Sequence, residues 1–160
     1  MRVVIIGGVA GGMSAATRLR RLDESAEIIV LERSGHVSYA NCGLPYYVGG
    51  VIAEEDKLYL QTPESLHNRF RLDVRVHHEV TEIAADKKVV IARDLISGKE
   101  SEISFDKLIL SPGASPVVPP IPGIERALTL RTVEDVLRIY DAVEVKPKNA
   151  VVIGGGFIGV

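Results

Sequence analysis

Short apolar runs bounded by glycine and polar residues mark the start of the chain. Arg2–Ile6 and Glu27–Leu31 are rich in branched aliphatic residues, which predicts strands buried on both faces of a parallel sheet. Between them a glycine cluster precedes Met13–Leu22, whose apolar residues recur with helical spacing. Strand, glycine turn, helix and strand within about 30 residues predict a βαβ unit.

From Asp73 onwards the pattern changes to short β-rich segments separated by turn-forming residues. We expect an antiparallel meander whose last strand returns to the parallel sheet. The predicted strands are Asp73–His77, Glu79–Ala84, Lys88–Arg93, Glu102–Ser104 and Lys107–Leu110. Before them, Pro63–Arg71 is predicted to be a short helix, whereas Val37–Gly50 has neither a clear helical nor a clear strand pattern.

The last fifty residues predict the beginning of a second domain. Ser111–Gly123 contains five prolines and is expected to be a stiff extended connection. Thr132–Val143 is predicted to be a helix with Thr132 as its N-cap. Ala150–Ile153 predicts a second buried strand, followed by a second glycine turn at Gly154–Gly159. A βαβ unit that stops within its own turn indicates part of a longer protein.

Composition narrows the class of protein. The 160 residues are 46% hydrophobic and 25% charged, and no stretch is apolar enough to span a membrane. A net charge of −2 gives no reason to expect a nucleic-acid partner. The single cysteine excludes an internal disulfide framework, and the first residues enter a strand without room for a signal peptide. We therefore expect a cytoplasmic protein with neither a nucleic-acid nor a membrane partner.

Two glycine clusters predict two dinucleotide sites. The first, at Gly7–Gly12, has the first and last glycines of the G-x-G-x-x-G fingerprint but Val9 in the middle. Its context is complete, since a strand precedes it, a helix follows, and Glu32 ends the next strand where a ribose-binding acid belongs. A glycine-rich turn in another kind of α/β protein is the alternative. The second cluster has all three glycines, and two dinucleotides are what an electron-transferring flavoprotein needs.

Cys42 is the chain's only cysteine. A lone cysteine is most often a small buried hydrophobic residue. Its neighbours from Ser38 to Tyr47 instead surround the sulfur with hydrogen-bonding groups and small residues. If a short helix begins near Cys42, its N-terminus would favour the thiolate nucleophile.

Four segments resemble one known family. Ile5–Ala16, Ser38–Gly50, Phe105–Pro116 and Val151–Gly159 are similar to the single-cysteine branch of the pyridine-nucleotide disulfide oxidoreductases. This branch includes coenzyme A-disulfide reductases and NADH-dependent persulfide or polysulfide reductases. The resemblance implies an α/β fold: a Rossmann-like FAD-binding domain with a parallel sheet and an antiparallel meander (1–112), a Pro-rich connection and helix (113–148), and the start of a Rossmann NAD(P)-binding domain (149–160).

The resemblance also implies residue roles. Cys42 would be nucleophile and redox centre, with Asn41 beside it, and NADH or NADPH would reduce the FAD that in turn reduces a CoA-linked sulfur–sulfur bond. The implied FAD contacts are Gly7, Gly8, Val9, Ala10, Gly11, Gly12, Glu32, Arg33, Asn41, Val80, Ser111, Gly113 and Arg131. The implied nicotinamide-dinucleotide contacts are Gly154, Gly156 and Gly159. The implied CoA contacts are Ser14, Arg18, Arg21, Ser38, Asn41 and Arg71.

The CoA site departs from the family in one place. A lysine used by some relatives corresponds to Phe70 here, and Arg69 or Arg71 is a candidate replacement. Arg18, Arg20 and Arg21 also have a simpler explanation, because cations near the end of a helix complement its dipole.

Two other functions stay open. An NADH oxidase would cycle Cys42 through a sulfenic acid, but its relatives usually carry a histidine where this chain has Ala10 and a serine where it has Asn41. A flavin-binding module that senses thiols without turnover is the third possibility. The resemblance further implies a homodimeric full-length protein and an inactive fragment. The four histidines do not gather, so no metal site is expected.

Overall fold

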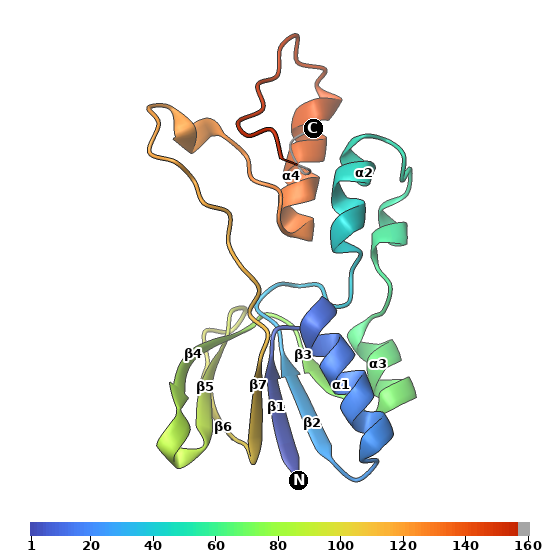
Figure 1. The fold of residues 1–160 in the computed structure, drawn as a ribbon, viewed down its shortest axis with the longest axis vertical. Coiled ribbons are helices and arrows are strands. Elements are labelled where there is room, and N and C mark those ends of the chain that lie inside the picture. The colour runs from blue at the N-terminus through green and yellow to red at the C-terminus, as the bar shows by residue number, and fades with distance from the viewer. Residues whose placement is uncertain (157–160) are drawn as a thin grey trace. The chain divides into compact units, whose positions relative to one another are not determined.

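The chain divides into two compact units, and a computed structural model describes its residues 1–156 (Figure 1). Unit 1 comprises Met1–Tyr39 and Tyr59–Gly113, and unit 2 comprises Ala40–Leu58 and Ala114–Val160. Each unit is therefore built from two separate stretches of sequence.

Unit 1 is centred on a four-stranded parallel sheet with the order β3-β2-β1-β7. In the register, Val4 of the central strand pairs with Ile29 on one side and Leu108 on the other. This central strand and its neighbour Glu27–Leu31 are also buried on both faces of the sheet, which agrees with their branched aliphatic composition. The strands are β1 (Arg2–Ile6), β2 (Glu27–Leu31), β3 (Asp73–Arg75) and β7 (Lys107–Leu110).

Different elements cover the two faces of this sheet (Figure 1). Helices α1 (Ala10–Leu22) and α3 (Pro63–Phe70) lie on one face, where Val3 and Ile5 are buried. The other face packs on an antiparallel sheet of β4 (His78–Ala84), β5 (Val89–Asp94) and β6 (Glu100–Ser104). Val4 points to this second sheet because side chains alternate along a strand. Each fully buried aliphatic side chain contributes about 1.5–3 kcal/mol.

The prediction that Asp73–His77 opens the meander is wrong. Its residues Asp73–Arg75 form β3, which pairs parallel with β2 at the edge of the main sheet. The strand follows α3, and a helical connection returns the chain in the same direction, which leads to parallel pairing. Helix α1 likewise begins at Ala10 rather than Met13, so Gly11 and Gly12 lie in its first turn.

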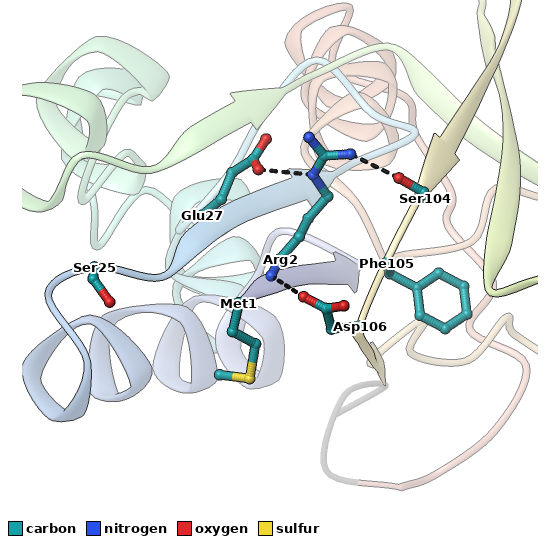
Figure 2. Close-up of a pocket in the computed structure, with 7 residues that line it drawn as sticks. All are labelled: Met1, Arg2, Ser25, Glu27, Ser104, Phe105 and Asp106. Carbon is teal, nitrogen blue, oxygen red and sulfur yellow. Dashed lines mark hydrogen bonds and ion pairs between the residues drawn. The ribbon is translucent and has the colours of Figure 1, made fainter.

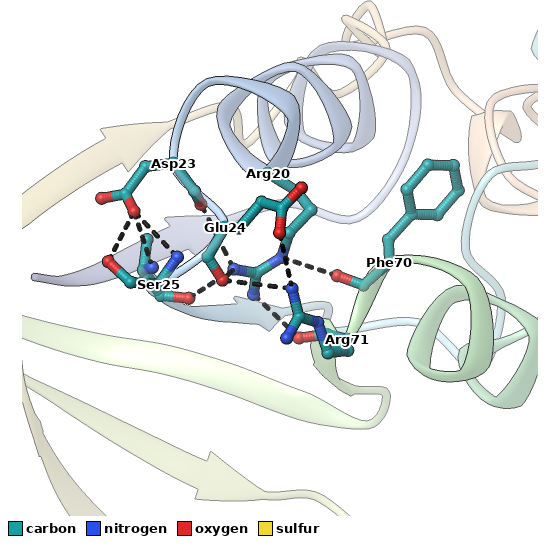
Figure 3. A network of polar contacts seen from close by, with 7 residues as sticks. Arg20, Asp23, Glu24, Ser25, Phe70 and Arg71 are labelled. Atoms are coloured by element: carbon teal, nitrogen blue, oxygen red, sulfur yellow. Dashed lines mark hydrogen bonds and ion pairs between the residues drawn. The ribbon is translucent and has the colours of Figure 1, made fainter.

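A buried arginine joins α1 to the end of α3 (Figure 3). Arg20 is 8% exposed, and its guanidinium donates five hydrogen bonds, all to backbone carbonyl oxygens. The acceptors are Asp23 (3.3 Å), Glu24 (2.8 Å), Ala26 (2.7 Å), Phe70 (2.8 Å) and Arg71 (3.0 Å). The carbonyl groups left over at a helix C-terminus thereby gain a charged donor.

Unit 2 contains the cysteine segment and the last helix. Its elements are the 3-10 turns Asn41–Gly43, Glu55–Leu58 and Ile124–Arg126, and helices α2 (Leu44–Val48) and α4 (Val133–Glu144). The predicted N-cap of α4 is confirmed, since the Thr132 hydroxyl accepts the Asp135 N–H and the Asp135 carboxylate accepts the Thr132 N–H. The proline-rich stretch up to Gly123 contains neither helix nor strand, as expected for a connection.

The predicted strand Ala150–Ile153 is absent. Its residues have no regular structure, and Val151, Val152 and Ile153 are 87%, 65% and 58% exposed. A parallel strand needs a neighbour to bond with. None of the described strands pairs with this segment.

Candidate functional site

The glycine turn at the end of β1 is shaped by backbone contacts. Gly7 has φ +102°, and its N–H donates to the carbonyl of Leu31 at 2.9 Å. A Cβ on Gly7 would collide with the carbonyl oxygen of Ser111, and a Cβ on Gly12 would collide with that of Gly7. These two positions therefore require glycine, as the fingerprint predicts.

The turn delivers the N-terminus of α1 towards the carboxyl end of the sheet. Val9 is the N-cap but makes no side-chain capping hydrogen bond, and the first turn contains no acidic residue. The N-terminus of a 13-residue helix is favourable for anions because its first N–H groups have no intrahelical acceptor. Ala10 and Gly11 are exposed there. This arrangement fits a diphosphate.

Glu32 lies beside the glycine turn, where the sequence predicts a ribose-binding acid. One carboxylate oxygen accepts the Gly8 N–H at 2.7 Å, and the other accepts the Ser34 N–H at 2.8 Å. Gly8 must be small, because a Cβ would come within 2.9 Å of the Glu32 Cβ and 2.7 Å of a Val37 methyl. The two backbone donors hold the carboxylate at the end of β2, in the position that a ribose hydroxyl would need.

Four further predicted FAD residues belong to unit 1. The Ser111 N–H donates to the Ile6 carbonyl at 2.8 Å, and its hydroxyl would lie 3.4 Å from a Cβ at Gly11, so Ser111 adjoins the turn. Arg33 is exposed, with its guanidinium 3.7 Å from Glu79. Val80 is half-buried in β4. Gly113, the last residue of unit 1, has φ +71°.

Arg131, another predicted FAD contact, belongs to unit 2. Its side chain donates to the Ala114 carbonyl at 3.1 Å, and its N–H donates to the Asp135 carboxylate. The predicted nicotinamide contacts Gly154 and Gly156 are exposed and lie outside regular structure. Gly159 lies outside the described residues.

Cys42 sits in a 3-10 turn directly before α2 and is exposed. A short helix thus begins near the thiol, which is the condition on which the predicted thiolate nucleophile depends. Asn41, its predicted partner, is half-buried in the same turn. Gly43 fits against Ala40 and Ile52, each of which would lie 3.2 Å from an added Cβ. The thiol is therefore presented on a tight turn rather than packed in a core.

Within α2, Tyr47 is buried whereas Tyr46 is exposed. Burial raises the pKa of Tyr47, and the nearby charge of Glu55 raises it further. Its ring stacks on that of Tyr140 in α4, with the ring centroids 4.9 Å apart.

A cavity of about 240 Å³ in unit 1 brings together two of the predicted CoA residues. Ser14 and Ser38 both line it, and the Ser38 N–H donates to the Gly8 carbonyl at 2.9 Å. The remaining lining residues are Met13, Thr17, Gln61, Leu66, Arg69 and Phe70. Thr17 and Gln61 were not predicted. Thr17 could have been found from its position one turn after Ser14, whereas nothing in the sequence singles out Gln61.

The predicted CoA arginines do not line this cavity. Arg18 and Arg21 are exposed on α1, and the Arg71 guanidinium lies 3.8 Å from the Glu24 carboxylate. Of the two candidate replacements for the family's lysine, Arg69 lines the cavity, and its guanidinium lies 5.1 Å from the centroid of the Phe70 ring. The structure thus places one cation, Arg69, at the cavity.

A larger cavity, about 450 Å³, lies at the amino ends of β1 and β2 (Figure 2). Arg2 dominates it, donating from its backbone to Asp106 (2.6 Å) and from its side chain to Glu27 (2.7 Å) and Ser104 (2.7 Å). The polar side chains of Glu27, Ser104 and Asp106 in this cavity are thus hydrogen-bonded to Arg2. Ligands of open α/β sheets bind at the carboxyl ends of the strands, so this cavity is not the candidate site.

Neither a metal site nor a membrane-spanning helix is found among the described residues. Over positions 1–156, no three His, Cys, Asp or Glu side chains are grouped so that they could hold a metal ion. Within the same range, no helix combines the length and apolar character that crossing a membrane requires.

The strand, the glycine turn, the helix N-terminus and the hydrogen-bonded Glu32 carboxylate together define a Rossmann-type α/β domain, the fold of FAD- and NAD-dependent oxidoreductases. The match to a family model extends over residues 1–160, and that family is described as pyridine nucleotide-disulphide oxidoreductase. The chain belongs to this family.

Similar proteins differ in the activity their names state. A coenzyme A disulfide reductase of Staphylococcus epidermidis is 36% identical over 160 residues, covering 99% of this chain and 36% of the relative. An NADH oxidase of Enterococcus faecalis is 36% identical over 162 residues, covering 100% of this chain and 36% of the relative.

Two solved structures are similar to nearly the whole of this chain. Reduced CoADR-RHD of Bacillus anthracis has a TM-score of 0.96 and 52% identity, covering 99% of this chain and 29% of that one. A NAD-dependent persulfide reductase from A. fulgidus has a TM-score of 0.94 and 41% identity, covering 99% and 30%. The chain therefore spans about a third of the length of the proteins it matches.

Proposed function

We propose that this chain is the FAD-binding part of an NAD(P)H-dependent flavoprotein that reduces a CoA disulfide, or a CoA-linked persulfide or polysulfide, through Cys42. The observation that carries the proposal is the exposed thiol of the chain's only cysteine, on a tight turn, in a member of a disulphide oxidoreductase family. Relatives named as CoA disulfide reductase and persulfide reductase support the choice of substrate.

The residues of the glycine turn fit the cofactor. Backbone N–H groups at the start of α1 would hold the diphosphate of FAD, and Glu32 would bind the adenosine ribose. Bound FAD supplies the transfer of two electrons from the nicotinamide to sulfur. Asn41 and Arg131 are proposed contacts from unit 2.

Cys42 would perform the thiol chemistry. Its thiolate attacks one sulfur of the disulfide, so that a mixed disulfide forms and one thiolate leaves. Two electrons and one proton, the equivalent of a hydride from NAD(P)H, would then break the mixed disulfide, releasing the second half as a thiol and restoring the Cys42 thiolate. Exposure of the thiol suits this step, because the incoming sulfur must reach it in line with the bond that breaks.

The 240 Å³ cavity would accept part of the CoA nucleotide. Ser14, Ser38 and Gln61 offer hydrogen bonds there, and Arg69 offers a positive charge for phosphate. Arg18, Arg21 and Arg71 are exposed, with Arg71 near Glu24, and stay proposed contacts for the remaining phosphates.

The test is the intact mass of the purified full-length protein, before and after dithiothreitol, with peptide mapping of the segment that contains Cys42. A CoA-sized adduct on Cys42 that the reductant removes is the expected result. Cys42→Ser should carry no adduct. A wild-type Cys42 that stays unmodified after incubation with CoA disulfide would contradict the proposal.

An NADH oxidase is the second candidate, since a relative of that name is equally identical to this chain. In that case Cys42 would be found oxygenated rather than thiolated, and NADH oxidation would consume oxygen stoichiometrically. Ala10 disfavours this activity, because alanine cannot act as the acid or base that a histidine in the glycine turn would supply. Asn41 also stands where such relatives usually carry a serine.

A further inference from the structure

Cys42 lies in a segment that cannot maintain its conformation alone. It belongs to a single 3-10 turn, Asn41–Gly43, that leads into α2, a helix of five residues. Helical segments of this length are unstable in water without tertiary contacts. The direction in which the thiol points therefore depends on what α2 packs against.

The buried side of α2 packs against α4 within unit 2. Leu44 and Tyr47 are 1% and 7% exposed, whereas Tyr46 is 58% exposed. The Tyr47 ring stacks on that of Tyr140, with centroids 4.9 Å apart and planes inclined by 24°. Offset aromatic pairs of this kind stabilise a defined mutual orientation.

Backbone hydrogen bonds fix the two ends of the segment. The Gly43 N–H donates to Ala40 and the Ala40 N–H to Leu58, both at 2.8 Å. After the helix, the Gly49 N–H donates to Pro45 at 3.0 Å. These bonds determine where the chain enters and leaves α2. The rotation of such a short helix about its axis is determined by its buried side chains.

We propose that Tyr140 is a positioning residue for Cys42 and acts through Tyr47. The ring stack sets the rotation of α2 and thus aligns the thiolate for attack on a disulfide. This inference rests on the proposed role of Cys42 as the nucleophile. In the step concerned, the Cys42 sulfur bonds to one sulfur of the disulfide, the sulfur–sulfur bond breaks, and the other half leaves as a thiolate.

The test compares Tyr140→Leu, which removes the aromatic ring but keeps an apolar side chain, with Tyr140→Phe, which keeps the ring. Val143→Ala is the matched control, since Val143 lies on the same helix but is 48% exposed. Three rates are measured on the full-length holoenzyme: reaction of Cys42 with CoA disulfide or an aromatic disulfide reagent, alkylation of Cys42 by iodoacetamide, and anaerobic reduction of FAD by NAD(P)H.

We expect Tyr140→Leu to slow the disulfide reactions about tenfold, with alkylation and FAD reduction within about twofold of wild type. Both reactions are in-line displacements, but a bulky disulfide can reach the sulfur from few directions, whereas the small iodoacetamide can approach an exposed thiol from many. Tyr140→Phe and Val143→Ala should match wild type. An unchanged disulfide rate in Tyr140→Leu, an equal loss in all three rates, or a Tyr140→Phe variant as slow as Tyr140→Leu would each overturn the inference.

The aromatic disulfide reagent separates this inference from the proposed function. A wild-type protein that reacts with the reagent but not with CoA disulfide would refute the CoA-linked function. The ratio of Tyr140→Leu to wild type with the same reagent would still decide whether Tyr140 positions the thiol.

Discussion

Replacement of Arg20 by methionine is expected to destabilise the protein more than any other arginine substitution on α1. Methionine has a similar length and fills much of the space but donates no hydrogen bond. Five carbonyl oxygens lose a charged donor, and they come from two places: the turn after α1 and the end of α3 (Figure 3).

The magnitude follows from the burial of these acceptors. The bond to Ala26 is buried, and leaving a buried acceptor without its donor costs about 1–3 kcal/mol. The bonds to Asp23, Glu24, Phe70 and Arg71 are partly buried, and water can replace the donor at about 0.5–1 kcal/mol each. Relief of the desolvated charge offsets part of the loss. We expect a net loss of about 3 kcal/mol, a large share of a typical stability of about 5–15 kcal/mol.

Urea unfolding of the full-length protein at a fixed FAD concentration measures the effect, because bound cofactor itself shifts the midpoint. Arg21→Met is the control, since Arg21 lies next to Arg20 on the same helix but is exposed. Its change should stay within about 0.5 kcal/mol. Arg20→Lys should recover part of the loss, as an ammonium group can serve only one of the two places. If Arg20→Met and Arg21→Met shift the midpoint equally, the structural role assigned to Arg20 is wrong.

Other variants test the turn, the cysteine helix and α4. Gly12→Ala should lower the free energy of unfolding by about 3 kcal/mol and reduce the FAD bound per chain, because its Cβ would collide with the Gly7 carbonyl. Gly11→Ala should keep the wild-type melting temperature, because its Cβ would lie 3.4 Å from the nearest atom. Burial raises the pKa of Tyr47 in the folded state. The stability that this difference contributes is complete below the ordinary tyrosine pKa of about 10 and is lost as pH rises through the folded value. In urea titrations, Tyr47→Phe should therefore lose less stability than wild type between about pH 9 and pH 11. Thr132→Ala should cost about 1 kcal/mol in the same assay, and an unchanged midpoint would contradict the capping role.

The sequence alone predicts β1, β2 and the N-cap of α4, because a few neighbouring residues determine each of them. The bounds of β1 and β2 agree with the predicted ones, because branched aliphatic runs flanked by glycine or charge have few alternatives. The N-cap Thr132 is also a local signal, because a threonine directly before a helical pattern can accept a hydrogen bond from the first turn. The pairing of β3 was not, since a short β-rich segment has the same composition in a parallel and in an antiparallel sheet, and its partner β2 lies far away in the sequence.

The role of Arg20 could have been predicted but was missed. Met13, Ala16 and Arg20 are spaced by three and four residues, and all three are buried on the same side of α1. The three arginines at the end of the helix are therefore not equivalent, because only Arg20 shares the apolar face. Arg18 and Arg21 are exposed, as most arginines in folded proteins are.

The glycine turn and the cysteine segment differ in how far sequence can describe them. Val9 departs from the fingerprint, yet as the N-cap it has φ −108°, which any residue can adopt, whereas Gly7 needs a positive φ and has glycine. The turn is thus encoded by the residues within it. The cysteine segment is not, because the ring that packs on Tyr47 comes from α4, far later in the chain. This explains why the sequence of α2 shows no helical pattern. Its five residues are too few for an amphipathic repeat, and their conformation depends on the buried side chains of Leu44 and Tyr47 and on their packing against α4.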